Sequence, residues 1–125
     1  MIGYVTIGTN DLKRAAEFYD GVMAIIGAGR IMEEERFIAW GVSPEAPGLS
    51  VTKPYDGNAA TVGNGMMVAL TAKNTDQVAA LHAKAMELGG QDEGPPGPRG
   101  DSGFYAAYFR DLDGNKLSAF CMATD

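Results

Sequence analysis

The sequence contains little of what several common kinds of protein require. One cysteine and one histidine occur among its 125 residues, which excludes an internal disulfide and any site that needs several histidines. The longest apolar run, Val22 to Gly29, is far shorter than the roughly 20 residues of a membrane-spanning helix. The chain starts directly with strand-like sequence and shows no signal-peptide pattern. We therefore expect a cytoplasmic protein with no membrane partner.

Basic residues are also scarce. Ten Lys and Arg stand against 16 Asp and Glu, which gives a net charge of -6, and no basic block occurs anywhere. Nucleic acids and anionic membranes are bound through clusters of Lys and Arg, so neither is an expected partner. A chain of this length suits one domain, and it buries about two-thirds of its unfolded surface without help from a disulfide or a structural metal. We expect a single domain over residues 1–125.

Two segments show the apolar spacing of three and four residues that is typical of an amphipathic helix. The first helix is predicted from Asp11 to Ile26, with Asn10 as its N-cap. The second is predicted from Thr75 to Leu88, capped by Asn74 or by Thr75 itself. Glycines follow both segments, as expected where a helix ends in a left-handed residue.

Strand-like segments surround the two predicted helices in the same order. One precedes each helix and three follow it, at 2–8, 29–33, 35–41 and 48–53 in the first half and at 66–71, 91–93, 103–110 and 116–122 in the second. This order predicts an α+β fold with an internal repeat of βαβββ modules over 1–55 and 64–125. The modules are expected to form a curved mixed sheet, with the helices on its convex side and a cup on its concave side.

The last two predicted strands are joined by the segment Asp111–Asn115, whose composition is that of a tight turn. Gly114 can take a positive φ, and the Asp and Asn side chains can bond their own backbone. A three-residue loop at this turn would pair Tyr108 with Ser118 across the hairpin. The Pro/Gly run at 94–103 is predicted to be a connecting loop beside the cup.

This hairpin and the opening segment Tyr4–Asp11 together resemble the vicinal oxygen chelate superfamily, the glyoxalase, bleomycin-resistance and extradiol dioxygenase group. Further similarity lies in Gly63-Asn64-Gly65, Gly89-Gly90, Gly94-Pro95-Pro96-Gly97 and Tyr105-Ala106-Ala107-Tyr108. The resemblance covers nearly the whole chain. It implies the cup-shaped fold predicted from the strand order, and it implies that the protein works as a homodimer.

The resemblance also indicates where a metal would be held. Metal enzymes of the superfamily take one ligand from each of up to four strands, and the matching positions here are Tyr4, Ser50, Met67 and Ser118. None of these is a histidine or a carboxylate, whereas zinc and Fe(II) sites need such ligands. The chain is therefore identified as a member that lacks the usual metal ligands, and we expect no metal and no cofactor.

The alternation of side chains along the predicted strands assigns a set of residues to the cup. Aromatic and methionine walls with a few hydroxyl groups favour a small, partly aromatic ligand. Lys116 at the mouth, or Arg30 or Arg36 near the rim, would favour an anionic one. The alternative is that these side chains simply fill a core between the sheets. The predicted ligand-binding residues are Tyr4, Thr6, Trp40, Ser50, Met67, Phe104, Tyr108, Lys116, Ser118 and Phe120.

Three functions are compatible with this pattern. The first is a metal-free protein that binds a small molecule, similar to the bleomycin-resistance branch. The second is a lyase, isomerase or dioxygenase of the same superfamily with an atypical metal site or none, in which Tyr4 or Tyr108 could act as a general acid. The third is an assembly or regulatory module with an unused cup. His82 and Cys121 are predicted to be structural residues, and catalytic residues stay unassigned.

Overall fold

Two helices and eight strands make up the computed structural model, which describes residues 1–123. The first half forms a four-stranded sheet in the order β1-β4-β3-β2, and the second half forms another in the order β5-β8-β7-β6. Pairs β1·β4 and β5·β8 are parallel and the others antiparallel. The predicted α+β class is confirmed. The elements are β1 Tyr4–Gly8, α1 Leu12–Ile25, β2 Gly29–Glu33, β3 Phe37–Gly41, β4 Gly48–Thr52, β5 Val68–Thr71, α2 Thr75–Glu87, β6 Gln91–Pro98, β7 Phe104–Arg110 and β8 Lys116–Met122.

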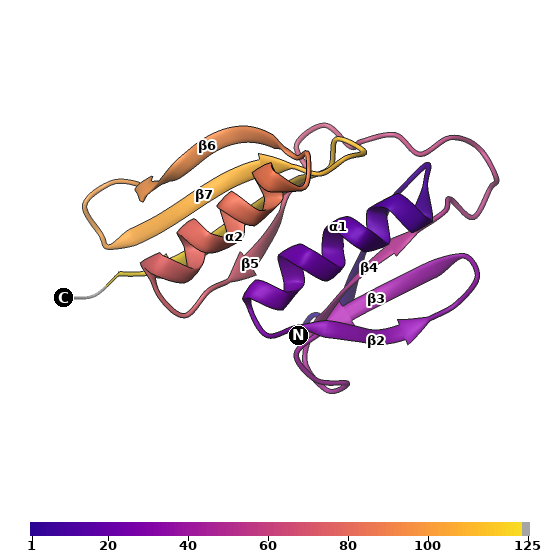
Figure 1. The fold of residues 1–125 in the computed structure, drawn as a ribbon, viewed down its shortest axis with the longest axis horizontal. Helices are drawn as coiled ribbons and strands as arrows, with labels where there is room; N and C mark the ends of the chain where they lie inside the picture. Colours follow the sequence, from indigo (N-terminus) through magenta and orange to yellow (C-terminus); the bar gives the residue numbers. More distant parts are fainter. Residues whose placement is uncertain (124–125) are drawn as a thin grey trace.

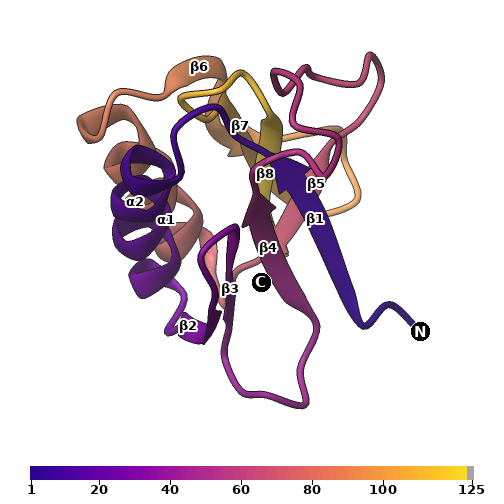
Figure 2. The same ribbon diagram turned by 90° about the vertical axis from the view of Figure 1, so that its right-hand side faces the viewer.

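Both helices lie on the same side of the two sheets. Figure 1 shows α1 and α2 next to each other in front of the strands, and Figure 2 shows the opposite side of the sheets left uncovered by helices. The predicted curved mixed sheet consists, within residues 1–123, of two four-stranded sheets with no hydrogen-bonded ladder between them. The chain therefore has two separate inner faces, one for each sheet.

The helices begin where side chains satisfy their first backbone N–H groups. Asn74 caps α2 as predicted and accepts from the Gln77 amide at 2.8 Å. The cap of α1 is Asp11, which accepts from the Arg14 amide at 3.1 Å, so the prediction of Asn10 is wrong. Asn10 instead exchanges hydrogen bonds with the backbone of Ala60, at 2.7 and 3.2 Å. No helix among the described residues is long and apolar enough to cross a membrane.

The core lies between the helices and the strand faces that look toward them. Alternation along the strands puts Ile7 of β1 and Leu117, Ala119 and Cys121 of β8 on this side, as predicted, and all four are buried. Phe18 of α1 is 1% exposed. Its ring centre lies 6.4 Å from that of Phe109 on β7, so the core runs continuously from one half of the chain into the other.

The second sheet confirms the predicted pairing in the last hairpin and corrects the predicted loop at 94–103. Tyr108 pairs with Ser118, and Gly114 in the turn takes a φ of 90°. The run that begins at Gly94 was predicted to be a loop, but its first part, through Pro98, belongs to edge strand β6. Proline is tolerated there because an edge strand needs ladder hydrogen bonds on one side only. The register of β6 shifts on both sides of Gly94.

The Asp111–Asn115 turn fastens the second half of the chain to the first. The Asp111 carboxylate, which is buried, accepts from the Tyr19 hydroxyl on α1 at 2.6 Å. Asp113 accepts from the Asn10 amide at 3.0 Å, and Asn115 donates to the Gly8 carbonyl at 2.9 Å. Burial raises the pKa of Tyr19 well above its usual value, and the neighbouring charge of Asp111 adds to the effect.

Candidate functional site

A hollow of about 610 Å³ lies on the inner face of the first sheet. Its floor carries the hydroxyl groups of Thr6 on β1 and of Ser50 and Thr52 on β4. These residues share a face because Thr6 lies opposite Ser50 in the parallel β1·β4 pair. The walls are mainly apolar and come from β2, β3 and the β3–β4 connection: Ile31, Met32, Phe37, Pro44 and Ala46.

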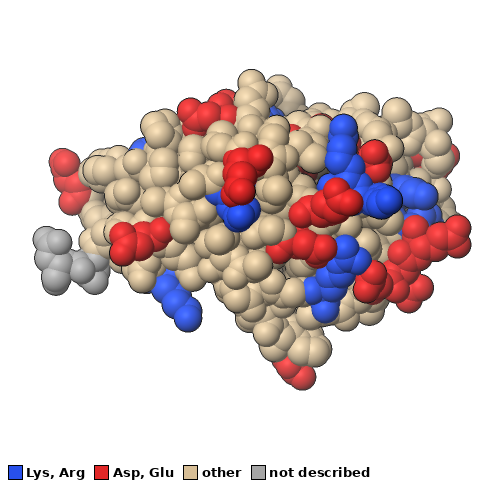
Figure 3. Space-filling view, in the orientation of Figure 1, with Lys and Arg blue, Asp and Glu red and all other residues tan. Residues whose placement is uncertain are grey.

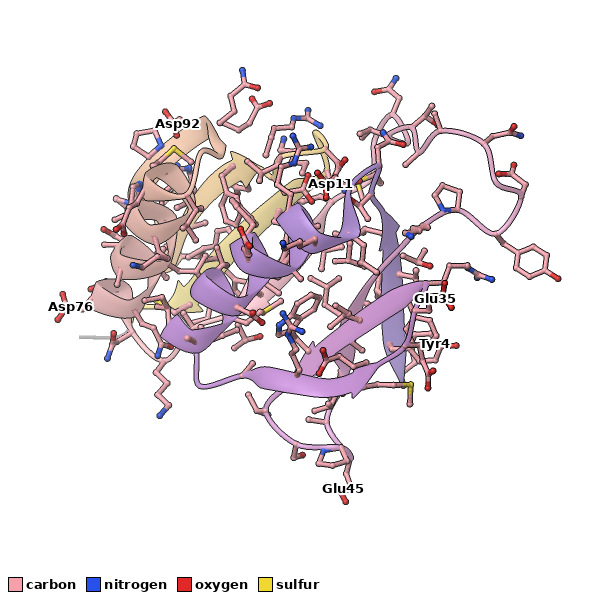
Figure 4. The ribbon with its side chains drawn as sticks, turned by 45° about the vertical axis from the view of Figure 1, so that its right-hand side comes forward. Tyr4, Asp11, Glu35, Glu45, Asp76 and Asp92 are labelled. Atoms are coloured by element: carbon pink, nitrogen blue, oxygen red, sulfur yellow. The ribbon has the colours of Figure 1, made fainter. Side chains whose placement is uncertain are left out.

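Two tyrosines and one arginine complete the rim of the hollow. Tyr4, 73% exposed, projects from β1 on the side away from α1 (Figure 4). The guanidinium carbon of Arg36 lies 5.0 Å from the ring centre of Tyr55, and both residues line the hollow. Arg36 has no carboxylate within ion-pair distance among residues 1–123. The rim therefore offers one positive charge without a counter-ion beside an aromatic ring.

The inner face of the second sheet carries a different set of side chains. Phe104 and Phe120 pack against each other with ring centres 5.7 Å apart. Beside them, the half-buried ring of Tyr108 has two cations over it: the Lys116 ammonium at 5.6 Å and the Arg99 guanidinium at 5.4 Å from the ring centre. Ser118 is buried between Tyr108 on β7 and Ala69 on β5.

The structure divides the predicted ligand-binding residues into three groups. Tyr4, Thr6 and Ser50 line the hollow of the first sheet. The second-sheet group lies on or beside the inner face of that sheet and does not line the hollow: Met67, Phe104, Tyr108, Lys116, Ser118 and Phe120. Trp40 belongs to neither group, because it is 1% exposed in the core on the helix side of β3.

The placement of Trp40 and Arg30 near the rim is therefore wrong. The two residues pair across β2 and β3, and both reach toward α1. The indole of Trp40 donates to Asp20 at 2.9 Å, and the Arg30 guanidinium lies 2.8 Å from the same carboxylate. Hydrogen bonds from Arg30 hold the pKa of Asp20 below its usual value. Figure 3 shows acidic and basic side chains next to one another over this helix-covered face.

Two residues of the inner faces were missed by the sequence predictions. Tyr55 is not among the predicted ligand-binding residues, and Arg99 falls in the run at 94–103 that is predicted to be a connecting loop. An aromatic residue inside a glycine-rich segment, and an arginine after a Pro/Gly run, were the signals available in the sequence. His82 and Cys121 lie away from the hollow. Both are buried, and His82 contacts Asp92 at 2.9 Å.

Comparison with known proteins identifies the class to which this architecture belongs. The arrangement of two βαβββ halves is similar to that of a solved glyoxalase/bleomycin resistance protein. The family model "Glyoxalase/Bleomycin resistance protein/Dioxygenase superfamily" matches residues 1–118. The chain therefore belongs to this superfamily. No curated protein matches it significantly.

Solved structures support the same assignment. A glyoxalase/bleomycin resistance protein from Albidiferax ferrireducens T118 is 36% identical, with a TM-score of 0.88 over 96% of this chain and 97% of that one. Lactoylglutathione lyase from Agrobacterium tumefaciens is 18% identical, with a TM-score of 0.69 over 96% and 92%. Fosfomycin resistance protein FosX from Listeria monocytogenes, complexed with Mn(II) and a dihydroxypropylphosphonic acid, is 15% identical, with a TM-score of 0.72 over 99% and 92%. The last two show the fold alone.

The residues at the family's metal positions do not fit a divalent metal. Tyr4 and Ser50 belong to the first sheet, while Met67 and Ser118 belong to the second. Two hydroxyls, a phenol and a thioether provide none of the imidazole or carboxylate ligands that zinc, manganese or Fe(II) prefer. In the part of the chain that the structure describes, no group of three or more His, Cys, Asp or Glu side chains could hold a metal ion.

Proposed function

We propose that this member of the superfamily binds a small aromatic anion in the first-sheet hollow, without a metal. The observation that carries the proposal is the combination of mainly apolar walls with a single uncompensated cation, Arg36, held against Tyr55 at the rim. Apolar walls favour a planar hydrocarbon part, and the guanidinium favours a carboxylate or sulfonate attached to it. The hydroxyls of Thr6 and Ser50 would orient the ligand. The proposed setting is the cytoplasm.

An enzyme of the same fold is the second candidate function. It is favoured by Tyr4, whose exposed phenol at the rim of the hollow could transfer a proton to a bound molecule. No histidine or carboxylate lines the hollow among the described residues, so Tyr4 would act without a visible general base. Binding is therefore proposed as the main function.

Equilibrium binding of anilinonaphthalene sulfonate, a fluorescent aromatic anion, tests the proposal. We expect saturable binding of one molecule per chain in a sample whose metal content, measured by elemental analysis, is far below one atom per chain. Binding should also raise the melting temperature, because the probe binds the folded state. Absence of saturable binding would contradict the proposal. A metal content near one atom per chain after dialysis would favour the enzymatic function instead.

We also propose that the protein works as a homodimer. Large apolar side chains are exposed on or beside edge strands β1 and β5 and at the end of β8: Ile2 is 53% exposed, Met67 45% and Met122 54%. Apolar exposure of this kind favours association of two copies. Sedimentation equilibrium at micromolar concentration should give twice the chain mass. A chain that sediments as a monomer under these conditions would refute the dimer.

A further inference from the structure

We propose that Asn64 is a site of spontaneous covalent modification, at which the side-chain amide is lost as ammonia and the backbone is rearranged. Asn64 is followed by Gly65 in the segment that connects the two halves of the chain, between β4 and β5. The reaction needs only the protein and water. It involves neither inner face, so it goes beyond the function proposed for the hollow and does not depend on it.

The reacting groups are neighbours in the chain, so the first step is intramolecular. The amide nitrogen of Gly65 loses its proton and attacks Cγ of Asn64, which closes a five-membered imide ring. The bond between Cγ and Nδ2 breaks, and Nδ2 takes up a proton and leaves as ammonia. Water then adds to one of the two imide carbonyl groups and opens the ring. One opening gives aspartate, and the other gives isoaspartate, in which the main chain runs through the side-chain CH₂ group.

The turn that carries Asn64 leaves both reacting groups free. Asn64 and Gly65 are the central residues of a turn closed by the Met66 amide, whose nitrogen lies 3.3 Å from the carbonyl oxygen of Gly63. Asn64 is exposed, and within residues 1–123 neither its side chain nor the Gly65 amide has a hydrogen-bond partner. Removal of the amide proton by solvent therefore breaks no contact of the fold.

Gly65 is the residue that lets its nitrogen approach the side chain of Asn64. A larger residue would crowd the attacking nitrogen, whereas glycine has no Cβ and adopts many backbone conformations. In the turn Gly65 has a φ of 92°, and no atom beyond its chain neighbours lies within 4 Å of the position that a Cβ would occupy. The imide ring thus has space to form without displacing another part of the protein.

Three of the other four asparagines are protected by the fold. Asn10 uses both polar atoms of its side chain in hydrogen bonds, and Asn74 accepts a hydrogen bond at the start of α2. Asn115 is buried, and its side-chain amide donates two hydrogen bonds. None of the three is followed by glycine.

Asn58 provides a matched control within the same connecting segment. It is exposed, and its side chain forms no hydrogen bond in the described part of the chain. It is followed by Ala59, whose methyl group hinders the attack that glycine permits. Asn58 and Asn64 therefore differ mainly in the residue that supplies the nitrogen.

Modification would change the connecting segment in two ways. The product carries a negative charge where the chain has a neutral amide, and isoaspartate adds one CH₂ group to the backbone path. The segment is in contact with the fold on both sides of Asn64. Before it, Val62 lies close enough to Gly114 that a Cβ there would be 3.3 Å from its Cγ2, and after it, Met66 packs against the core. The longer path should displace one of these contacts and lower the melting temperature.

Incubation of the intact protein at mildly alkaline pH, followed by peptide mapping with mass spectrometry, tests the site. We expect Asn64 to lose its amide at least about tenfold faster than Asn58, because no Cβ hinders the attack. The products should include both aspartate and isoaspartate. Mapping also separates Asn64 from Asp56, which precedes Gly57 and could form the same imide by loss of water.

The same incubation in urea shows whether the fold leaves Asn64 free. We expect its rate in the folded protein to lie within about threefold of the rate in the unfolded chain, because no contact must open first. Equal rates at Asn58 and Asn64 would overturn the proposal. So would a rate at Asn64 that is more than about tenfold slower in the folded protein than in urea, since the turn would then protect the site.

Two variants test the effect of the modification on the fold. Asn64→Gln would require a larger imide ring, so its melting temperature should stay constant during incubation while that of the wild type falls with the isoaspartate content. Asn64→Asp, freshly purified, adds the charge without the longer backbone path and should melt above the modified wild type. An unchanged melting temperature in fully modified protein would refute the expected displacement of Val62 or Met66.

Discussion

Replacement of Asp111 by alanine is expected to lower the free energy of unfolding by about 3 kcal/mol. The carboxylate accepts four hydrogen bonds, from the Tyr19 hydroxyl, the Asp113 amide, and the amide and side chain of Asn115. Tyr19 is fully buried, so its hydroxyl would lose its acceptor where water cannot replace it. Urea denaturation of wild-type and variant proteins measures the difference.

Asp101→Ala is the matched control for this substitution. Asp101 is exposed and forms no side-chain hydrogen bond or ion pair within the described residues. Its replacement should change stability by less than about 0.5 kcal/mol. If Asp111→Ala costs no more than Asp101→Ala, the Asp111–Asn115 turn does not hold the two halves together as described.

Tyr19→Phe gives the pH dependence of the same contact. The folded protein raises the pKa of Tyr19, so above about pH 10 the unfolded chain releases this proton while the folded chain retains it. Wild-type stability should therefore fall as the pH rises past that value. The variant lacks the titrating group. Its deficit of about 1–2 kcal/mol at neutral pH should shrink in alkali, and a constant deficit would contradict this account.

Ser50→Phe is expected to weaken binding of anilinonaphthalene sulfonate by more than about tenfold. Ser50 lies on central strand β4, on the floor of the hollow, between Thr6 and Ala39 of the neighbouring strands. A phenylalanine there would project into the space that the probe needs. Arg36→Gln should cost less, about fivefold, because it removes one charge at a solvent-exposed rim. Fluorescence titration gives both dissociation constants.

Ser102→Phe controls for the added aromatic surface. Ser102 is exposed in the segment between β6 and β7 and does not line the hollow. Its variant should bind the probe as the wild type does. Unchanged binding by Ser50→Phe, in a variant that keeps its melting temperature, would mean that the probe binds elsewhere.

The sequence predicted those parts of the fold that depend on local patterns. Apolar spacing located both helices to within a residue at each end, because their buried faces repeat every three or four positions. The register of β7 and β8 was predicted from a three-residue loop at the Asp111–Asn115 turn, and a shift of one residue would expose Leu117 and Phe109. Local chemistry and long-range packing agree in these segments.

The predictions failed where tertiary contacts override local preference. Asn10 is a good helix cap by composition, but contact with Ala60 occupies its side chain and Asp11 takes its place. Trp40 looked like a pocket residue because it is aromatic, yet its position on β3 turns it toward α1. Gly94–Pro98 looked like a loop because Pro and Gly usually end strands, but an edge position accommodates them.

The division of the site into two faces could not be predicted from alternation. Alternation decides which face of its own strand a side chain occupies, and it assigned Thr6 and Tyr108 to inner faces, whereas Ser50 was predicted from the family resemblance. It says nothing about whether two sheets join. It also cannot place residues outside strands, such as Tyr55 and Arg99, which reach the inner faces through irregular backbone.

The contact between the Asp111–Asn115 turn and the start of α1 has a consequence for protein synthesis. Thr9 and Asp113, which bond each other, are 104 positions apart, and Asn115 bonds a carbonyl 107 positions away. The N-terminal half is synthesised first, and the residues of the Asp111–Asn115 turn that bond to it are absent until the last hairpin has been synthesised. Until then the Tyr19 hydroxyl lacks the Asp111 carboxylate that accepts its hydrogen bond. Final stability is reached only after residues up to Asn115 have been translated.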